Sequence, residues 1–242
     1  DVFATDDFAS AGRHDLVILA LKAHIIASVA AQMPALFHPQ TIVLTAQNGL
    51  PWWYFQRHGG PYEGHCVRTV DPHASIMSAV DPQRIIGCVV YPAAAIASPG
   101  VVKHIEGNRY PLGELDGTTT ERVSGIAAAF TAAGLKAPIL DNIRAEIWLK
   151  LWGNLSFNPI SALTHSTLVD LCQHPLTRAL AQHMMAEAQT IANKLGVSFR
   201  VSIDNVADDG GPADRVDNVR TSVENIIAVA QYMQGSDHLV GS

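Results

Sequence analysis

The chain has 242 residues, of which 48% are hydrophobic and 16% are charged, and its formal net charge is −6. This length suits one large or two modest domains, and the apolar content is sufficient for a sizeable core. The sequence contains no block of basic residues, so we predict no nucleic-acid partner. The three cysteines are scattered without a C-x-x-C pair, which predicts neither a metal site nor a disulfide framework and favours a reducing cytoplasm.

The N-terminal region lacks the pattern of a membrane span or a signal peptide. Its most apolar stretch, residues 16–31, is interrupted by Lys22 and His24. It also falls short of the roughly 20 apolar residues that a span requires, so we predict no membrane partner. The first residue is Asp1 rather than Met, and we expect a chain that is processed or truncated at its start.

The first half of the chain follows the strand–helix–strand pattern of a parallel sheet. Residues 15–20 and 41–45 are short, nearly continuous apolar runs, typical of strands that are buried on both faces. The stretch between them, residues 24–36, is predicted to be helical and completes a βαβ unit. Turn signals later in the chain indicate that antiparallel strands extend the sheet. These further strands are expected at residues 84–91, 101–106 and 110–113.

From Thr118 onward the pattern changes from strands to helices. Residues 118–121 are predicted to cap a helix that ends near Gly134. Two longer helices are expected after it, one over residues 141–158 and one that starts at Pro175 and stops at Gly196. The second half of the chain is therefore predicted to be helical.

These patterns predict an α/β fold in two domains. Residues 1–116 would form a partial Rossmann-type, doubly wound sheet, and residues 117–242 an all-helical C-terminal domain. Ligands bind such sheets at the carboxyl ends of the strands, where Lys22 follows the first strand and Asn48 the second. Asn48 and Gly49 also make a common turn pair, and Lys22 could be an ordinary residue at the N-terminus of a helix. However, a cation is unfavourable at the start of a helix, and an anionic ligand would remove that conflict.

Residues 148–159 contain the strongest functional pattern. Lys150, Asn154 and Asn158 are spaced by four, so on a helix their side chains share one stripe that drifts by about 40° per step. The surrounding residues are apolar, and a charge and two amides are costly to bury without partners. The alternative is that the three side chains face solvent, with Lys150 extending outward from a buried stem. We predict a site for a small polar ligand along this stripe.

Four segments, taken in order, match one protein family, namely residues 15–23, 46–51, 91–102 and 144–159. Together with the stripe of one lysine and two asparagines, they make the chain resemble ketopantoate reductase (2-dehydropantoate 2-reductase). The resemblance implies NADPH-dependent reduction of 2-dehydropantoate, a small keto acid, to pantoate, a step towards pantothenate and coenzyme A. It also implies a cytoplasmic enzyme with a Rossmann domain and a C-terminal domain like that of 6-phosphogluconate dehydrogenase.

The resemblance implies roles for several polar residues on the substrate side. Lys150 matches the general acid of the family, and Asn154 and Asn158 match asparagines that hold the substrate. Ser222 matches a substrate-binding serine.

The apolar faces of the helical region would allow a homodimer, which the sequence does not decide.

Further residues match cofactor contacts of the family. Lys22 and Asn48 match two of them, and Asn48 would also lie close to the substrate. Ala93 is the nearest match to an alanine that touches the cofactor. An ammonium near the keto oxygen would stabilise the charge that develops when hydride arrives at the keto carbon, which agrees with the chemistry expected of the stripe.

The sequence departs from the family at both ends. The G-x-G-x-x-G turn that seats a pyrophosphate is absent, so we expect Asp1 to begin inside the dinucleotide domain. Towards the C-terminus the family glutamate is not found, and Gln234 stands where we expect it, although the resemblance resumes at Asp237. We attribute this to a compensated reading-frame change within about residues 204–236, which resequencing can test.

Two other functions remain open from the sequence. One is another 2-keto or 3-hydroxy acid dehydrogenase of the same plan, since such enzymes also use a lysine followed four residues later by an asparagine. The second asparagine, Asn158, favours ketopantoate reductase. The other is a non-catalytic ligand sensor or degenerate remnant, which the missing glycine-rich turn and glutamate favour.

Overall fold

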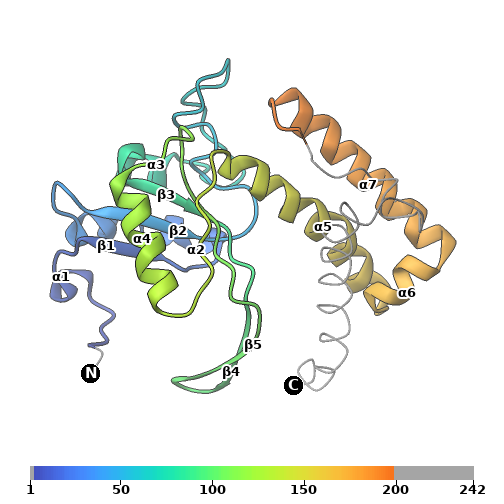
Figure 1. Ribbon diagram of the computed structural model, residues 1–242, viewed down its shortest axis with the longest axis horizontal. Coiled ribbons are helices and arrows are strands. Elements are labelled where there is room, and N and C mark those ends of the chain that lie inside the picture. The colour runs from blue at the N-terminus through green and yellow to red at the C-terminus, as the bar shows by residue number, and fades with distance from the viewer. Residues whose placement is uncertain (1–2, 199–242) are drawn as a thin grey trace. The chain divides into compact units, whose positions relative to one another are not determined.

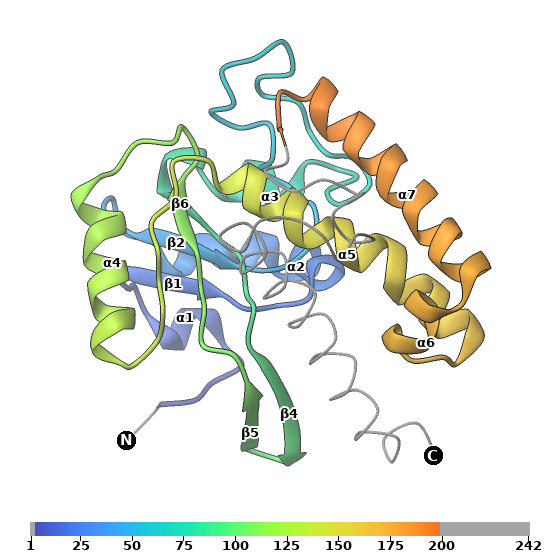
Figure 2. The same ribbon diagram turned by 45° about the vertical axis from the view of Figure 1, so that its right-hand side comes forward.

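A four-stranded sheet forms the centre of the N-terminal part of the molecule. The computed structural model describes residues 3–198 and has the strand order β1-β2-β3-β6 (Figure 1, with β6 labelled in Figure 2). The strands are β1 (Leu16–Leu19), β2 (Ile42–Ala46), β3 (Ile85–Cys88) and β6 (Leu112–Glu114). The first three run parallel, and β6 is antiparallel to β3. The predicted buried strands and the Rossmann-type α/β class are thereby confirmed.

A separate antiparallel hairpin follows β3. It consists of β4 (Ala93–Ser98) and β5 (Val101–Glu106), which pair with each other in a two-stranded sheet and project away from the main sheet (Figures 1 and 2). The prediction that residues 101–106 extend the main sheet is therefore wrong. Pro92, between β3 and β4, has no N–H with which to continue a ladder, and the chain leaves the sheet there. Among the described strands, β6 supplies the antiparallel neighbour that the turn signals indicated.

Helices cover both faces of the sheet. Side chains alternate along a strand, so Val43 joins the core on one face while its neighbour Leu44 joins the core on the other. Trp52 and Trp53, in the loop after β2, are each 1% exposed and belong to the first of these cores. The first face is covered by α2 (Ala23–Val29), the 3₁₀ helix η1 (Ala30–Leu36) and α3 (Ser75–Ala79), and the second by α4 (Glu121–Ala132).

Cys88 at the end of β3 lies in the second core and is only 2% exposed. Because burial disfavours the charged thiolate, it raises the pKa of this thiol to about 12.

Two short helices complete the N-terminal part of the chain, namely α1 (Phe8–Ala11) and the 3₁₀ helix η2 (Pro82–Arg84).

The described chain divides into two compact units between Ile147 and Trp148. This point lies later than the boundary at residue 117 expected from the change in sequence pattern. The difference arises because α4 packs on the sheet, where its side chains Val123 and Ile126 share a core with strand residues. Thr120 accepts a hydrogen bond from the N–H of Val123 at the start of α4, as the predicted cap requires.

The C-terminal unit consists of helices. The helix α5 (Ile143–Thr164) begins in the N-terminal unit and continues through Pro159, and α6 (Leu168–Gln173) and α7 (Pro175–Lys194) follow. The indole N–H of Trp152 donates to the backbone oxygen of Met185 across 2.7 Å, which holds α5 and α7 together. Gly196, with a φ of 79°, follows the end of α7 as predicted. In the described part of the chain, no helix combines the length and hydropathy needed to cross a membrane.

Candidate active site

The carboxyl ends of the three parallel strands are joined by side chains that follow β2. The Gln47 amide donates to the backbone oxygen of Leu21, just after β1, across 2.8 Å. The side-chain oxygen of Asn48 accepts from the backbone N–H of Val90, just after β3, across 3.1 Å. Gly49 has a φ of 89°, a value that favours glycine, so the chain can turn sharply behind these contacts. This edge is where open α/β sheets bind their ligands.

Lys22 is placed at the same edge. It is exposed and occupies the N-cap position of α2, where its side chain makes no capping hydrogen bond. Serine, threonine, aspartate and asparagine are the usual N-cap residues, because they accept from the free N–H groups. A lysine cannot do so, but its ammonium can pair with an anionic group at this edge. The sequence predicted that Lys22 and Asn48 each follow the carboxyl end of a strand. In the structure Lys22 follows β1 and Asn48 follows β2.

Ala93 is the first residue of β4 and is partly exposed. It lies three residues after Val90, whose N–H is held by Asn48. The segment from Val90 to Ala93 therefore starts at the carboxyl edge and leads away from it into the hairpin. Lys22, Asn48 and Ala93 all follow the carboxyl end of a parallel strand.

Lys150, Asn154 and Asn158 lie on the continuous helix α5, so their spacing of four places them along one stripe. Lys150 and Asn154 are partly buried, while Asn158 is exposed. The sequence left open whether this stripe is a sheltered site or faces solvent. The structure lies between these two alternatives, because burial decreases from Lys150 to Asn158. The fourth substrate-side residue, Ser222, lies outside the described residues, as does the segment with the expected frame change.

A buried arginine fixes the start of α5. The Arg144 guanidinium donates to the backbone oxygens of Tyr54 and Gln56, each across 2.7 Å, and also to that of Leu115. Burial lowers the pKa of Arg144, since the charged form is displaced from water. Three carbonyl acceptors compensate this cost, and they join α5 to the loop after β2 and to the segment after β6.

Glu146, which the sequence reasoning missed, lies one turn before Lys150 on α5. Its carboxylate accepts a hydrogen bond from the hydroxyl of Tyr91 across 2.7 Å and forms an ion pair with Arg109. Burial, followed by the charge of Glu146, raises the pKa of the Tyr91 hydroxyl, so that it remains a donor. The signal in the sequence was the spacing, because Glu146 precedes Lys150 by the same four residues that separate the members of the stripe.

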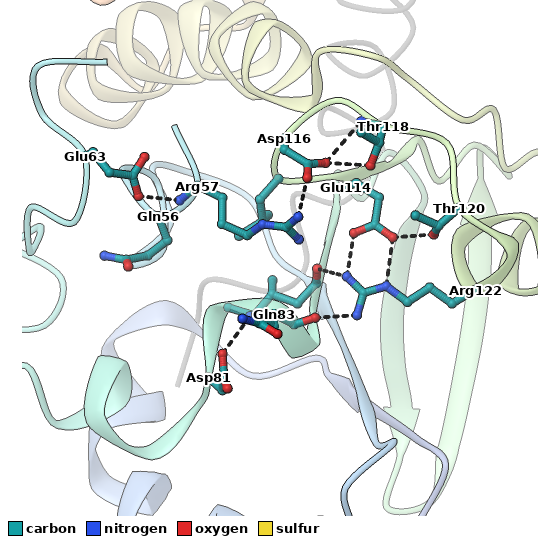
Figure 3. A network of polar contacts seen from close by, with 12 residues as sticks. Gln56, Arg57, Glu63, Asp81, Gln83, Glu114, Asp116, Thr118, Thr120 and Arg122 are labelled. Carbon is teal, nitrogen blue, oxygen red and sulfur yellow. Dashed lines mark hydrogen bonds and ion pairs between the residues drawn. The ribbon is translucent and has the colours of Figure 1, made fainter. Parts of the chain in front are cut away.

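A polar cavity of about 370 Å³ lies near the amino end of β3, at the opposite edge of the sheet. Arg122 donates to both carboxylate oxygens of Glu114, across 2.7 and 2.5 Å, and Arg57 pairs with Asp116 (Figure 3). Each arginine thus faces a carboxylate, and the cavity offers little net charge to a ligand. The lining residues are Arg57, Gln83, Glu114, Thr120 and Arg122. We interpret this network as a structural clamp.

Within residues 3–198, histidine, cysteine and acidic side chains form no group of three that could hold a metal ion. The side chains at the carboxyl edge are instead a cation, an amide and small residues. Such a set suits an organic anion that is bound by hydrogen bonds and charge.

Comparisons with known proteins identify the family of the chain. Two family profiles match, "Ketopantoate reductase PanE/ApbA" over residues 2–57 and "Ketopantoate reductase PanE/ApbA C terminal" over residues 142–234. A 2-dehydropantoate 2-reductase from Mesorhizobium japonicum is 52% identical over 193 residues, which cover 80% of this chain and 59% of that protein. The chain thus spans about three fifths of the length of this relative.

Solved structures show the same fold. A protein from Ralstonia solanacearum, provisionally named a ketopantoate reductase, has a TM-score of 0.82 and 41% identity, covering 85% of this chain and 64% of its own. D-mandelate dehydrogenase solved with NADH and anilino(oxo)acetate has a TM-score of 0.64 over 80% of this chain and 56% of its own. Its 19% identity makes it a likeness of fold alone. From the two matching profiles and the 52% identical relative, we conclude that the chain belongs to the ketopantoate reductase family.

Proposed function

We propose that the protein reduces 2-dehydropantoate to pantoate with NADPH, as a step towards pantothenate and coenzyme A. The observation that carries this proposal is the 52% identity to a 2-dehydropantoate 2-reductase over most of the chain. The stripe of Lys150, Asn154 and Asn158 on α5 supports it with side chains suited to a keto acid. A cytoplasmic location and a homodimer stay predictions from the sequence.

The residues at the carboxyl edge fit a dinucleotide. An exposed Lys22 at an N-cap position would pair with a phosphate, and Asn48 would offer its amide N–H groups while its oxygen remains on Val90. Ala93, with its small side chain, would allow close approach to the backbone. When bound, NADPH supplies the hydride that reduces the keto carbon.

The residues of α5 would carry out the remaining chemistry. As negative charge develops on the keto oxygen, the ammonium of Lys150 stabilises it and transfers a proton, so that the oxygen becomes a hydroxyl. Lys150 then regains its proton from solvent. Asn154 and Asn158 would orient the substrate by hydrogen bonds to its carboxylate and hydroxyl.

The test uses the protein expressed from its complete gene. We expect oxidation of NADPH that depends on 2-dehydropantoate, and a loss of kcat of about a hundredfold or more in Lys150→Ala. Asn158→Ala should mainly raise KM. Lys194→Ala, which removes an exposed lysine at the end of α7, is the matched control and should leave both constants unchanged.

The same assay separates the rival functions. Equal or faster turnover of another 2-keto acid, such as the keto acid of mandelate, would favour a different dehydrogenase of this plan. Faster turnover with NADH would revise the cofactor. Tight binding of 2-dehydropantoate without turnover would favour a sensor.

A further inference from the structure

A cluster of three side chains connects α5 to the segment that follows β3. The carboxylate of Glu146 accepts from the Tyr91 hydroxyl across 2.7 Å and pairs with Arg109. The Arg109 guanidinium also lies over the Tyr91 ring, 4.8 Å from its centroid. In addition, the backbone N–H of Tyr91 donates to the oxygen of Arg109 across 3.2 Å. Each member therefore contacts the other two, which restricts all three side chains.

The cluster adjoins the residues proposed to bind the cofactor. Tyr91 directly follows Val90, whose N–H is held by Asn48, and it precedes Ala93 by two residues. On its other side, Glu146 precedes Lys150 by four residues on a continuous helix, which is about one turn. A short chain of contacts thus leads from the carboxyl edge of the sheet to the turn of α5 before Lys150.

Stability alone is a weak reason for a carboxylate at this position. The Glu146 side chain is only 12% exposed, and removing a carboxylate from water is costly. Buried ion pairs are often no more stabilising than apolar side chains of similar volume. Hydrogen bonds of fixed direction, however, restrict where a helix can lie, which apolar contacts do less strictly.

We propose that Glu146 is a positioning residue, which holds the first turn of α5 against Tyr91 and thereby sets the location of Lys150 for proton transfer. This inference rests on the proposed function. Glu146 touches neither substrate nor cofactor in this role, and it acts through Tyr91 on one side and through the helix on the other.

Loosening this contact should affect turnover more than binding. A displacement of a catalytic group by about 1 Å can slow a reaction by about a hundredfold, so we expect Glu146→Ala to lower kcat by about tenfold to a hundredfold. The affinity for NADPH, measured by fluorescence titration, should change by less than about twofold because the carboxyl edge keeps its own hydrogen bonds.

The decisive experiment is a double-mutant cycle in the protein expressed from its complete gene. Tyr91→Phe removes the hydrogen bond from the hydroxyl to Glu146 and leaves the ion pair between Glu146 and Arg109, so this variant should be less disturbed in folding than Glu146→Ala. We expect Tyr91→Phe and Glu146→Ala together to lower kcat no more than Glu146→Ala alone, since both remove the same contact. Glu146→Gln should recover part of kcat, because an amide oxygen still accepts from Tyr91.

Asp116→Asn is the matched control. Asp116 also pairs with an arginine in the same unit, but near the opposite edge of the sheet, so its loss should lower the melting temperature without lowering kcat. Independent, additive effects of Tyr91→Phe and Glu146→Ala would overturn the inference. The inference would also be overturned if, at temperatures where both proteins are folded, the kcat of Glu146→Ala lay within about twofold of the kcat of the unmodified protein. If the unmodified protein itself does not reduce 2-dehydropantoate, the proposed function fails instead.

Discussion

The side-chain oxygen of Asn48 accepts a hydrogen bond from the backbone N–H of Val90 across 3.1 Å. The two residues follow the neighbouring strands β2 and β3, and their hydrogen bond links the segments that leave these strands at the carboxyl edge of the sheet. One atom of the Asn48 amide is therefore structural, while its nitrogen remains available for the ligand that we propose. A substitution can separate these two roles.

Asn48→Asp should preserve stability and weaken cofactor binding. The carboxylate still accepts from Val90, so the melting temperature should stay near that of the unmodified protein. The lost N–H donor and the added negative charge should lower NADPH affinity by about tenfold or more. Asn48→Ala, in contrast, should lower both quantities. Unchanged NADPH affinity in Asn48→Asp, measured by fluorescence titration, would remove Asn48 from the cofactor site.

Arg144→Met should destabilise the N-terminal unit strongly. Methionine fills much of the same volume but leaves three buried carbonyl oxygens without their donor. The expected cost is about 3 kcal/mol of unfolding free energy or more, measured by urea denaturation. Arg68→Met at an exposed position should change stability little. Similar values for the two variants would show that water replaces the guanidinium.

The two ion pairs of the clamp should differ in their contribution to stability. Glu114 is 1% exposed, so Arg122→Met leaves a buried carboxylate without its partner, at an expected cost of about 3 kcal/mol. Asp116 is 30% exposed and can be solvated by water, so Arg57→Met should cost less than about 1 kcal/mol. Chemical denaturation of both variants under the same conditions gives the comparison. An equal loss in both would contradict this account.

His58 should make stability decrease in mild acid. Burial, and secondly the charge of Arg144, lowers the pKa of His58 below its ordinary value of 6.5. The unfolded chain therefore takes up the proton more readily than the folded one. The contribution of neutral His58 is complete above pH 6.5 and is lost as the pH falls through the lower, folded pKa. His58→Gln should flatten the decline in unfolding free energy over this range, whereas His24→Gln, at an exposed position, should not.

Two glycines should respond to alanine in opposite directions. Gly125 lies within α4 with open space where a Cβ would be, so Gly125→Ala should stabilise by up to about 1 kcal/mol through helix propensity. At Gly113 in β6 a Cβ would lie 2.9 Å from both the Leu140 oxygen and the Ile143 Cβ. Gly113→Ala should therefore destabilise by about 2 kcal/mol. Thermal melts of the two variants test both signs.

The sequence predicted those elements whose signal is local. β1 and β2 appeared as apolar runs, α4 through its threonine cap, and α5 and α7 through their length and apolar spacing. β4 was missed because its alanine-rich sequence has little strand preference, and pairing with β5 determines its conformation. The short helix α3 was also missed. It begins beside Asp71, which accepts from the N–H groups of Ile76 and Met77 and replaces the missing local cap.

The same distinction applies to the candidate site. The stripe from Lys150 to Asn158 was predictable since helix periodicity alone aligns its members. The partners of Glu146 were not, because Tyr91 and Arg109 are 55 and 37 residues away in the chain. Only the fold brings these side chains together.

Cys88 offers a chemical reporter of opening in the N-terminal unit. Thiol reagents attack the thiolate, and the Cys88 thiol is both 2% exposed and raised in pKa to about 12. It can therefore be modified only during excursions in which β3 separates from α4. With the less buried Cys66 and Cys172 replaced by serine, the rate of labelling at Cys88 reports how often those excursions occur. Ligands that bind the folded sheet should lower this labelling rate, and at equal concentration the tighter ligand should lower it more.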